Sequence, residues 1–443
     1  MSSPFLSSPT DALHGDIMPP GDKSMSHRAI MLGGIAEGLT TVRGLLEGED
    51  VLCTVAALRE LGVTITREAG VWRIEGIGLD HLRAPARPLN MGNSGTAARL
   101  LMGLLGGRNF TSSFTGDASL CKRPMRRVIT PLEMMGAVFE SADGKLPLSV
   151  RGAAQPTAIS YRLPVASAQV KSAILLAGLS AEGVTTVIET SPTRDHTENM
   201  LRCFGAEVVI TRQEDGAEAI AVTGKPSLKG RNVIVPADPS SAAFPMVAAL
   251  LRKGSRLLLR NVGINPRRAG LIDTLIEMGA AIKLLNRRIE GGEPVADLVV
   301  HASALKAVIV PPERAPSMID EYPILAVAAA CATGTTRMRG LGELRVKESD
   351  RLALMAEGLR RCGVKVGIEG DDLIVHGNGS HLPPEGGAEI ETAMDHRIAM
   401  SFLVLGMAAR RPVRIDDGSF IATSFPDFIG MMNGLGARIE SVG

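Results

Sequence analysis

A pattern that recurs six times along the chain constrains the fold more than any other feature of the 443-residue sequence. In each copy a helix-like stretch ends at a glycine and continues into an alternating strand, as in LRCFGAEVVI around Gly205. Successive glycines are 74, 69, 74, 84 and 73 residues apart, and they are Gly62, Gly136, Gly205, Gly279, Gly363 and Gly436. Glycine suits this place because it adopts the left-handed conformation that ends many helices. The pattern predicts an α/β protein built from six repeats of about 74 residues.

Each copy also contains a second helix-like stretch that is apolar on nearly every side. The predicted starts lie near residues 24, 95, 168, 241, 320 and 396. Because a helix without a polar face is normally buried, we expect each of these helices inside its repeat. Their first residues are polar, and they read GDKSMSHR, MGNSGTAAR, ASAQVKS, DPSSAAF, MIDEYP and MDHRIAM. A helix N-terminus attracts anions through its unpaired N–H groups, so six such starts facing one place would form an anion site.

Composition excludes several classes of protein. The formal net charge is +1 and aromatic residues make up 3%, which argues against a nucleic-acid or anionic-membrane partner. The five cysteines form no CxxC pair, so neither a disulfide framework nor a thiolate zinc site is expected, and a reducing compartment fits. The longest apolar run, Ile324 to Ala332, has nine residues, about half of a membrane span, and no signal peptide is recognisable. We therefore expect a cytoplasmic protein.

Basic residues gather beside the polar helix starts. They are Lys23, Arg28, Arg123, Arg194, Lys347, Arg351 and Arg397. So many cations with few neighbouring acids indicate a polyanionic ligand, which arginine grips through paired N–H donors. Asp320 and Glu348 are the carboxylates closest to these segments, so they are the candidates for acid–base chemistry. GDKSMSHR is not a Walker loop, HExxH is missing, and no catalytic metal is expected.

Nine motifs between residues 21 and 428 resemble those of the 5-enolpyruvylshikimate-3-phosphate (EPSP) synthase family, and they stand in the family's order. They are GDKSMSHR, NSGTAAR, KRPM, SAQVK, TRDHTE, SMIDEYP, RVKESDR, MDHRIAM and SFPDF. SAQVK and TRDHTE are similar to the second bacterial class, which contains glyphosate-tolerant members. The resemblance implies a two-domain, inside-out α/β barrel with three repeats in each domain and the active site in the cleft between them. With crossings at the turn residues of PPGD and PADPSS, the domains would be 1–20 plus 240–443, and 21–239.

The activity implied by the resemblance is that of a transferase of the shikimate pathway, which leads through chorismate to the aromatic amino acids and is the target of glyphosate. The enolpyruvyl group of phosphoenolpyruvate would pass to the 5-hydroxyl of shikimate 3-phosphate. Phosphate would leave from a tetrahedral intermediate. The resemblance implies a monomer that needs no metal and no cofactor.

The resemblance also assigns roles to individual residues. Asp320 would accept the proton of the 5-hydroxyl, and either Glu348 or Lys23 would protonate the methylene carbon. The residues expected to hold shikimate 3-phosphate are Lys23, Ser24, Arg28, Ser167, Ala168, Gln169, Arg194, Asp320 and Lys347. Those expected around phosphoenolpyruvate are Lys23, Gly95, Arg123, Gln169, Arg351 and Arg397.

The sequence departs from the family pattern at two places. Thr423, in IATSFPDF, stands where other members carry a lysine, so any grip of that lysine on phosphoenolpyruvate is absent or moved. INPRR at 264–268 differs from the NxTR pattern associated with the second class. Gly95, in contrast, is the residue that some tolerant members replace with alanine, whose methyl group crowds glyphosate. We therefore expect this chain to lack that steric block.

Three other functions were weighed against this one. A UDP-N-acetylglucosamine enolpyruvyl transferase uses a mobile-loop cysteine, and Cys121 lies near a comparable loop, but GDKS and DHR favour the shikimate enzyme. A non-catalytic anion-binding repeat protein would gain nothing from Asp320 and Glu348. An RNA cyclase should show a nucleophilic histidine and a basic surface, and neither is found.

Overall fold

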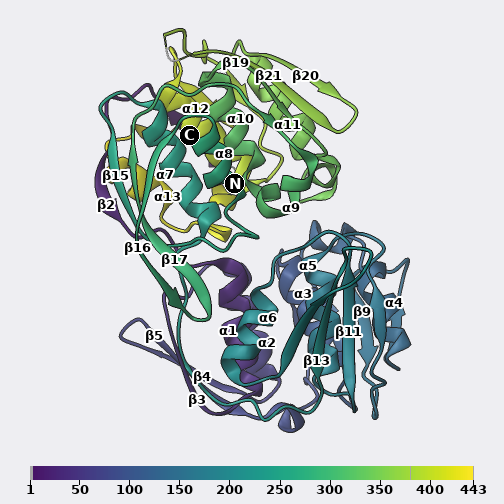
Figure 1. Ribbon diagram of the computed structural model, residues 1–443. Helices are drawn as coiled ribbons and strands as arrows, with labels where there is room; N and C mark the ends of the chain where they lie inside the picture. Colours follow the sequence, from purple (N-terminus) through teal and green to yellow (C-terminus); the bar gives the residue numbers. More distant parts are fainter. Residues whose placement is uncertain (1–2, 380, 443) are drawn as a thin grey trace. The chain divides into compact units, whose positions relative to one another are not determined.

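The computed structural model describes residues 3–379 and 381–442 as a mixture of helices and strands (Figure 1). Contacts divide the chain into two compact units. Unit 1 comprises Met1–Pro20, Pro236–Arg288 and Pro294–Gly443, and unit 2 comprises Gly21–Val235 and Ile289–Glu293. Residues 1–2 and 443 of the predicted first domain lie outside the described residues. The second crossing thus falls at 235/236, whereas the turn residues had placed it after 239.

Ile289–Glu293, which join unit 2, form the turn between strands β16 (Ala281–Glu290) and β17 (Glu293–His301). Within unit 2 the carboxylate of Glu293 is buried, and its Oε1 lies 2.9 Å from His196 Nδ1. The chain therefore passes between the units four times, where the sequence had indicated two crossings. Nothing local in the sequence marks this turn, because its role depends on a partner almost a hundred residues away.

The described residues form six four-stranded sheets, three in each unit, as six repeats require. The sheets of unit 2 are β14-β3-β5-β4, β6-β7-β9-β8 and β10-β11-β13-β12. Their strands are β3 (Glu37–Arg43), β4 (Thr64–Glu68), β5 (Val71–Ile77), β6 (Leu89–Asn90), β7 (Thr111–Thr115), β8 (Val138–Ser141), β9 (Leu148–Arg151), β10 (Ser160–Arg162), β11 (Val184–Glu189), β12 (Val208–Arg212), β13 (Glu218–Thr223) and β14 (Asn232–Ile234).

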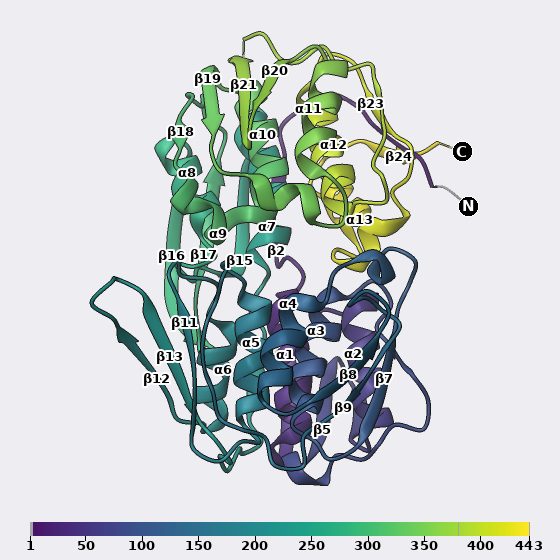
Figure 2. The same cartoon turned by 90° about the vertical axis from the view of Figure 1, so that its right-hand side faces the viewer.

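The sheets of unit 1 are β16-β17-β15-β2, β18-β19-β21-β20 and β22-β23-β1-β24. Their remaining strands are β1 (Phe5–Ser7), β2 (His14–Ile17), β15 (Arg256–Gly263), β18 (Ile309–Val310), β19 (Thr333–Met338), β20 (Lys365–Glu369), β21 (Asp372–Asn378), β22 (Glu389–Ile390), β23 (Val413–Ile415) and β24 (Ile439–Ser441). The first strand, β1, pairs with β23 and β24 near the end of the chain (Figure 2). The last repeat is therefore completed by the first residues of the protein.

Near the crossings at Pro20 and Val235, two sheets each take a strand from a distant part of the sequence. In four repeats, the strand before the buried helix pairs in parallel with the strand after it, as β10 does with β11. In the other two repeats, that place is taken by β14, which pairs with β3, and by β2, which pairs with β15. These pairings tie the crossing points into the sheets of both units.

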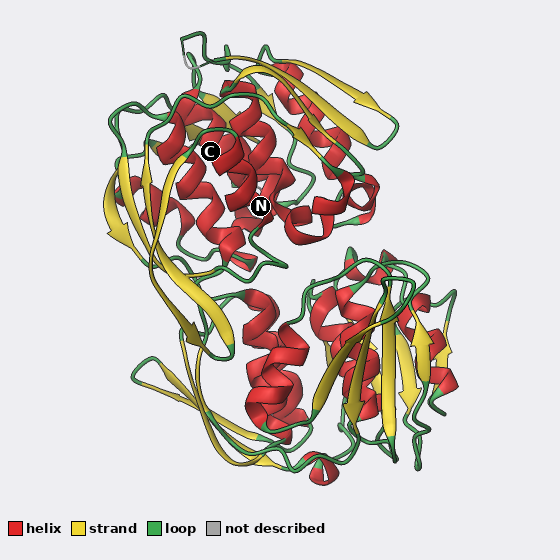
Figure 3. Cartoon of the chain, in the orientation of Figure 1, coloured by secondary structure: helices red, strands yellow, loops and turns green. Residues whose placement is uncertain are grey.

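The six apolar helices predicted from the sequence are present and form the interior of the units. They are α1 (Lys23–Ile35), α3 (Gly95–Gly106) and α5 (Ala168–Gly178) in unit 2, and α7 (Pro239–Leu251), α10 (Tyr322–Cys331) and α12 (His396–Ala408) in unit 1. In each unit the strands lie outside the helices (Figure 3). Helices α3 and α5 pack closely, because a Cβ at Gly103 would lie 2.3 Å from the carbonyl oxygen of Ala173.

The second helix of each repeat ends as predicted. These helices are α2 (Glu49–Glu60), α4 (Arg126–Met134), α6 (His196–Phe204), α8 (Gly270–Glu277), α11 (Arg351–Arg361) and α13 (Phe428–Gly434), and the short α9 (Ala315–Met318) precedes α10. All six recurring glycines have positive φ, from 79° at Gly363 to 111° at Gly436. A side chain is strained in this conformation, which explains why glycine recurs there.

Five of the six buried helices begin at a serine or aspartate whose side chain accepts a backbone N–H of the first turn. These residues are Asp22, Ser94, Ser167, Asp238 and Asp395. The prediction that serine or aspartate caps these helices is thus confirmed for five of the six. Among the described residues, no helix is long and apolar enough to cross a bilayer, and no group of three or more His, Cys, Asp or Glu side chains could hold a metal ion.

Candidate active site

In unit 1, the predicted acids and bases meet around Arg351, the first residue of α11. Its Nη2 lies 2.6 Å from Glu348 Oε2, and its Nη1 lies 3.3 Å from Asp320 Oδ1. Lys347 Nζ is 3.7 Å from the same Asp320 oxygen. The local sequence explains this arrangement, because RVKESDR places a lysine, a glutamate and an arginine on the few residues that lead into a helix. Both predicted catalytic carboxylates are thus within reach of cations in one cluster.

Asp395, the N-cap of α12, holds the side chain of Arg351 in place. Its carboxylate accepts hydrogen bonds from Arg351 Nε at 2.8 Å, from Ser349 Oγ at 2.8 Å and from the backbone N–H of Arg397 at 2.9 Å. Burial raises the pKa of Asp395, but the charges of Arg351 and His396 and the hydrogen bond from Arg351 together hold that pKa below its ordinary value of 3.8. Burial likewise lowers the pKa of Arg351, and attraction to Asp395, Glu348 and Asp320 more than restores it, so the net pKa is raised. Arg351 is therefore a permanently charged and rigidly held guanidinium.

Arg397 lies on the first turn of α12, next to the same cluster. Its Nη1 donates to the carbonyl oxygen of Asp320 at 3.2 Å. Thr423, where the family lysine is replaced, donates to the carbonyl of Phe420 and has its Oγ1 3.5 Å from His396 Nδ1. A threonine in this place carries no charge, so it cannot take over an ionic contact with a substrate.

In unit 2, Lys23 begins α1 and its Nζ lies 2.6 Å from Asp50 Oδ2. Arg28, one turn further along α1, is buried and donates from Nε to Thr197 Oγ1 at 2.7 Å and from Nη2 to Ser172 Oγ at 2.9 Å. Burial lowers the pKa of Arg28 to about 10, so it still carries its charge at neutral pH. Its hydrogen bonds connect the first turns of α1, α5 and α6.

Three residues predicted around the substrates, Gly95, Gln169 and Arg123, lie at or near the starts of α3 and α5. Gly95 begins α3, and a Cβ at this position would lie 2.6 Å from Arg99 Nη1 and 3.3 Å from Arg123 Nη1. Arg123 donates from Nη2 to Asn93 Oδ1 at 2.6 Å. Gln169 accepts from Arg99 Nη1 at 2.9 Å and donates to Thr96 Oγ1 at 3.0 Å. Arg99 therefore joins Gly95 to Gln169, and it also donates to the carbonyl oxygen of Pro124, the residue after Arg123.

The remaining predicted residues of unit 2 also lie at or next to the N-terminus of a helix. Ser24 lies in the first turn of α1, and its carbonyl oxygen accepts from Arg28 Nη1 at 2.9 Å. Ser167 is the N-cap of α5, and Ala168 is the first residue of that helix. Arg194 stands two residues before α6. All predicted residues of unit 2 are thus found at or near helix N-termini, where anions are favoured.

Sequence reasoning missed four charged residues that contact the predicted ones. They are Asp50, Arg99, Glu321 and Asp395. Asp395 could have been recognised, because it precedes a buried helix in MDHRIAM. Arg99 ends the motif NSGTAAR and could also have been recognised, whereas Asp50 lies on α2 outside every motif. Only the fold brings them to Lys23 and Gln169.

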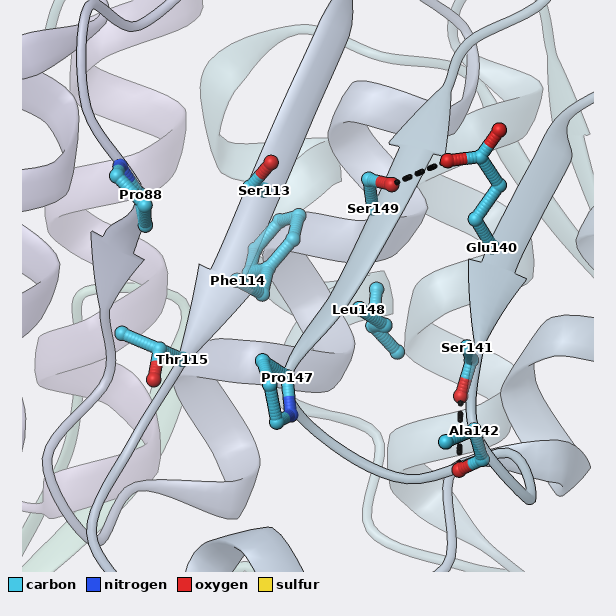
Figure 4. Close-up of a pocket in the computed structure, with 10 residues that line it drawn as sticks. All are labelled: Pro88, Ser113, Phe114, Thr115, Glu140, Ser141, Ala142, Pro147, Leu148 and Ser149. Atoms are coloured by element: carbon cyan, nitrogen blue, oxygen red, sulfur yellow. Dashed lines mark hydrogen bonds between the residues drawn. The ribbon is translucent and has the colours of Figure 1, made fainter.

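A shallow surface pocket of about 490 Å³ lies elsewhere on unit 2, along β7, β8 and β9 (Figure 4). It is lined by Pro88, Ser113, Phe114, Thr115, Glu140, Ser141, Ala142, Pro147, Leu148 and Ser149. None of the predicted site residues lines it, and its one charged side chain is Glu140. A pocket without cations is unsuited to phosphorylated ligands, so it is not the candidate site.

Comparisons with known proteins agree with the motifs. A model of the family described as EPSP synthase (3-phosphoshikimate 1-carboxyvinyltransferase) matches residues 7–432. The chain belongs to the EPSP synthase family. The 3-phosphoshikimate 1-carboxyvinyltransferase of Paramagnetospirillum magneticum is 63% identical over 99% of both chains, and that of Methylorubrum extorquens is 60% identical over 99% of this chain and 97% of its own. Membership confirms the resemblance drawn from the nine motifs and the predicted class of transferase.

Solved structures of the EPSP synthase family share the fold. The 2.37 Å EPSP synthase structure from Acinetobacter baumannii has a TM-score of 0.90 and 48% identity, and each chain covers 100% of the other. The predicted α/β fold is thereby confirmed. The curated relatives carry the shikimate name, and the UDP-N-acetylglucosamine alternative is not favoured.

Proposed function

We propose that this chain transfers the enolpyruvyl group of phosphoenolpyruvate to the 5-hydroxyl of shikimate 3-phosphate and releases phosphate. The observation that carries this proposal is the cluster in unit 1, in which Asp320 and Glu348 both lie against the Arg351 guanidinium. Addition to an enol ether needs a group that takes a proton and a group that gives one, beside fixed cations. The names of the relatives support the choice of these two substrates.

Both substrates are phosphorylated carboxylates, so binding them requires many cations. Unit 1 offers Lys347, Arg351 and Arg397, and unit 2 offers Lys23, Arg28, Arg123 and Arg194. In our proposal, Lys23, Ser24, Arg28, Ser167, Ala168, Gln169, Arg194, Asp320 and Lys347 hold shikimate 3-phosphate. Lys23, Gly95, Arg123, Gln169, Arg351 and Arg397 hold phosphoenolpyruvate. Each unit alone therefore supplies only part of the binding groups.

Asp320 takes the proton of the 5-hydroxyl group. At the same time, the hydroxyl oxygen bonds to the carbon of phosphoenolpyruvate that carries the phosphate and the carboxylate. Arg351 Nη1 and Lys347 Nζ lie 3.3 and 3.7 Å from Asp320 Oδ1. The same cations stabilise the negative charge of the tetrahedral intermediate. In the second step the methyl group returns a proton and the phosphate departs.

Two groups are suited to protonating the methylene carbon. Glu348 lies 2.6 Å from Arg351 and is partly exposed, and Lys23 lies 2.6 Å from Asp50. Both have an opposite charge beside them, so the contacts favour neither. A comparison of solvent-deuterium incorporation into the methylene group in Glu348→Gln and Lys23→Met would assign the role.

We further propose that the chain acts as a monomer in the cytoplasm and that it belongs to the second bacterial class. Five free cysteines among the described residues suit a reducing compartment. The two domains that we propose, 1–20 plus 240–443 and 21–239, follow the two compact units except at residues 236–239 and 289–293.

The experiment that tests the function compares two acceptors. Phosphate release from phosphoenolpyruvate is measured with shikimate 3-phosphate and, separately, with UDP-N-acetylglucosamine. We expect turnover only with shikimate 3-phosphate, and no loss of rate in Cys121→Ser, because Cys121 Sγ donates to the carbonyl oxygen of Gly116 at 3.4 Å and a serine hydroxyl can donate to it as well. Turnover with the sugar nucleotide alone, lost in Cys121→Ser, would overturn the proposal.

A further inference from the structure

Glu321 follows the proposed base in the sequence, and its carboxylate lies 3.6 Å from an arginine proposed for phosphoenolpyruvate, Arg397. We propose that Glu321 is a positioning residue, which fixes the Arg397 guanidinium so that its outer N–H groups bind phosphoenolpyruvate. This inference rests on the function proposed above. Glu321 is the last residue of a short 3-10 turn, Ile319–Glu321, that also carries Asp320.

Glu321 is a buried charge, and a buried charge must be compensated. Its side chain is 1% exposed. Ser240 Oγ donates a hydrogen bond to Oε1, and the same oxygen lies 3.5 Å from Arg268 Nη1 and 3.6 Å from Arg397 Nη1. Oε2 has no hydrogen-bond donor among the described residues. The contacts of Glu321 therefore converge on one oxygen, which sits between two guanidinium groups.

Arg268 also pairs with a second carboxylate, that of Asp238. Its Nη2 donates to Asp238 Oδ1 at 3.1 Å and to Ser240 Oγ at 2.9 Å. Ser240 in turn donates to Glu321, so a hydrogen-bonded path runs from Arg268 through Ser240 to the carboxylate. Because Asp238 balances the charge of Arg268, the negative charge of Glu321 remains for Arg397. Asp238 and Ser240 both lie at the start of α7 and are buried, which makes this support rigid.

Arg397 is held at one end only. Among the described residues, the side-chain partners of Arg397 are the carbonyl oxygen of Asp320 and the carboxylate of Glu321, and both contact Nη1. Nε and Nη2 keep their donors for a ligand, and a guanidinium fork binds carboxylate or phosphate through such a pair. The Arg351 guanidinium differs, because its three nitrogens all face protein carboxylates. The geometry thus orients Arg397 without using up its binding edge.

The test is Glu321→Gln, which keeps the size of the side chain and removes its charge. Steady-state rates are measured with each substrate varied at saturating concentrations of the other. We expect the KM for phosphoenolpyruvate to rise about tenfold, the KM for shikimate 3-phosphate to stay within about twofold, and kcat to fall less than about threefold. A purely structural defect would instead lower kcat through loss of folded enzyme and leave both KM values unchanged.

Glu313→Gln is the matched control, because Glu313 is exposed and lies eight residues upstream of Glu321. It should leave every constant unchanged. Ser240→Ala is the second variant, since it removes the hydroxyl that fixes Glu321 and keeps both charges. We expect it to raise the KM for phosphoenolpyruvate about threefold. If Glu321→Gln does not fold, Ser240→Ala decides alone.

The experiment distinguishes a failure of the proposed function from a failure of the role proposed for Glu321. If the unchanged protein does not turn over phosphoenolpyruvate with shikimate 3-phosphate, the proposed function fails. If it does turn over, and the KM for phosphoenolpyruvate is unchanged in the folded variants, the role of Glu321 is overturned.

Discussion

At the scale of single residues, Gly95 is where the absence of a side chain has the most direct consequence. A Cβ there would lie 2.6 Å from Arg99 Nη1 and 3.3 Å from Arg123 Nη1, so both guanidinium groups would have to shift. We predict that Gly95→Ala weakens inhibition by glyphosate at least about tenfold, with a smaller rise in the KM for phosphoenolpyruvate. Inhibition curves at several phosphoenolpyruvate concentrations measure both effects.

Gly106→Ala, in the same helix, is the matched control for Gly95→Ala. A Cβ at Gly106 would make only ordinary contacts, the nearest at 3.7 Å to Ala137 and Leu132. Glyphosate inhibition should be unaffected by this change. If Gly95→Ala also left inhibition unchanged, the steric account of position 95 would be wrong.

Asp395 carries the prediction that depends on pH. Asp395→Asn would leave the buried Arg351 guanidinium without its bidentate partner, at a cost of about 3–5 kcal/mol in the free energy of unfolding. The folded-state pKa of Asp395 is below 3.8, so its stabilising contribution is complete above that pH and is lost as pH falls through the lowered folded value. Urea unfolding, followed by far-ultraviolet circular dichroism, measures the difference between the two proteins.

The difference between Asp395→Asn and the unchanged protein should be constant from about pH 5 to 8 and should shrink only at lower pH. Asp11→Asn is the control, because Asp11 is exposed and forms a single surface ion pair with Arg438. A difference that already declined between pH 7 and 5 would show that the pKa of Asp395 is not lowered.

Most of the candidate residues could be identified from motifs, and their supporting residues could not. Lys23 and Arg397 stand in the polar starts of buried helices, and Arg351 stands in the polar segment RVKESDR at the start of α11, so all three are marked in the sequence itself. Asp50 stands outside every motif, and Glu321 is part of SMIDEYP, but their partners are set by contacts at 2.6 and 3.6 Å that only the folded chain creates. A sequence of one chain carries no separate signal for such contacts.

At the scale of secondary-structure elements, Lys171 ties α5 to β11 and α6. Its Nζ is completely buried and lies 3.0 Å from Glu189 Oε1 and 2.7 Å from Glu198 Oε1. We predict that Lys171→Met lowers the free energy of unfolding by about 3–5 kcal/mol, because it leaves two buried carboxylates without their cation. The fluorescence of Trp72, the single tryptophan of the chain, reports unfolding of unit 2, where Lys171 also lies.

Lys225→Met is the matched control for Lys171→Met. Lys225 pairs with Glu182 at the surface of the same unit, and both side chains are more than half exposed. Surface ion pairs contribute little, so the urea midpoint should barely move. Equal effects of the two substitutions would contradict the role assigned to the buried lysine.

The elements that follow from local pattern were predictable, and those that depend on distant pairing were not. Gly205 and its five counterparts mark helix ends because left-handed φ excludes most side chains. The pairing of β14 with β3 joins residues 232–234 to 41–43, and no local period announces it. The turn at Ile289–Glu293, which belongs to unit 2, was missed for the same reason.

At the scale of the whole molecule, the residues of the proposed reaction come from both units. Asp320, Glu348, Lys347, Arg351 and Arg397 belong to unit 1, and Lys23, Arg28, Arg123 and Arg194 belong to unit 2. A chain of six repeats places three polar helix starts in each unit. Activity is therefore expected of the full chain and of neither unit alone.

Phosphate release from phosphoenolpyruvate and shikimate 3-phosphate by Asp320→Asn shows whether Asp320 is the general base of the proposed reaction. A general base contributes about 10²–10⁴-fold to a rate, so kcat should fall by that factor while the protein stays folded. Asp11→Asn, at an exposed site of the same unit, should retain the full rate. If Asp320→Asn kept more than about a tenth of the activity, the assignment of Asp320 as the base would be contradicted.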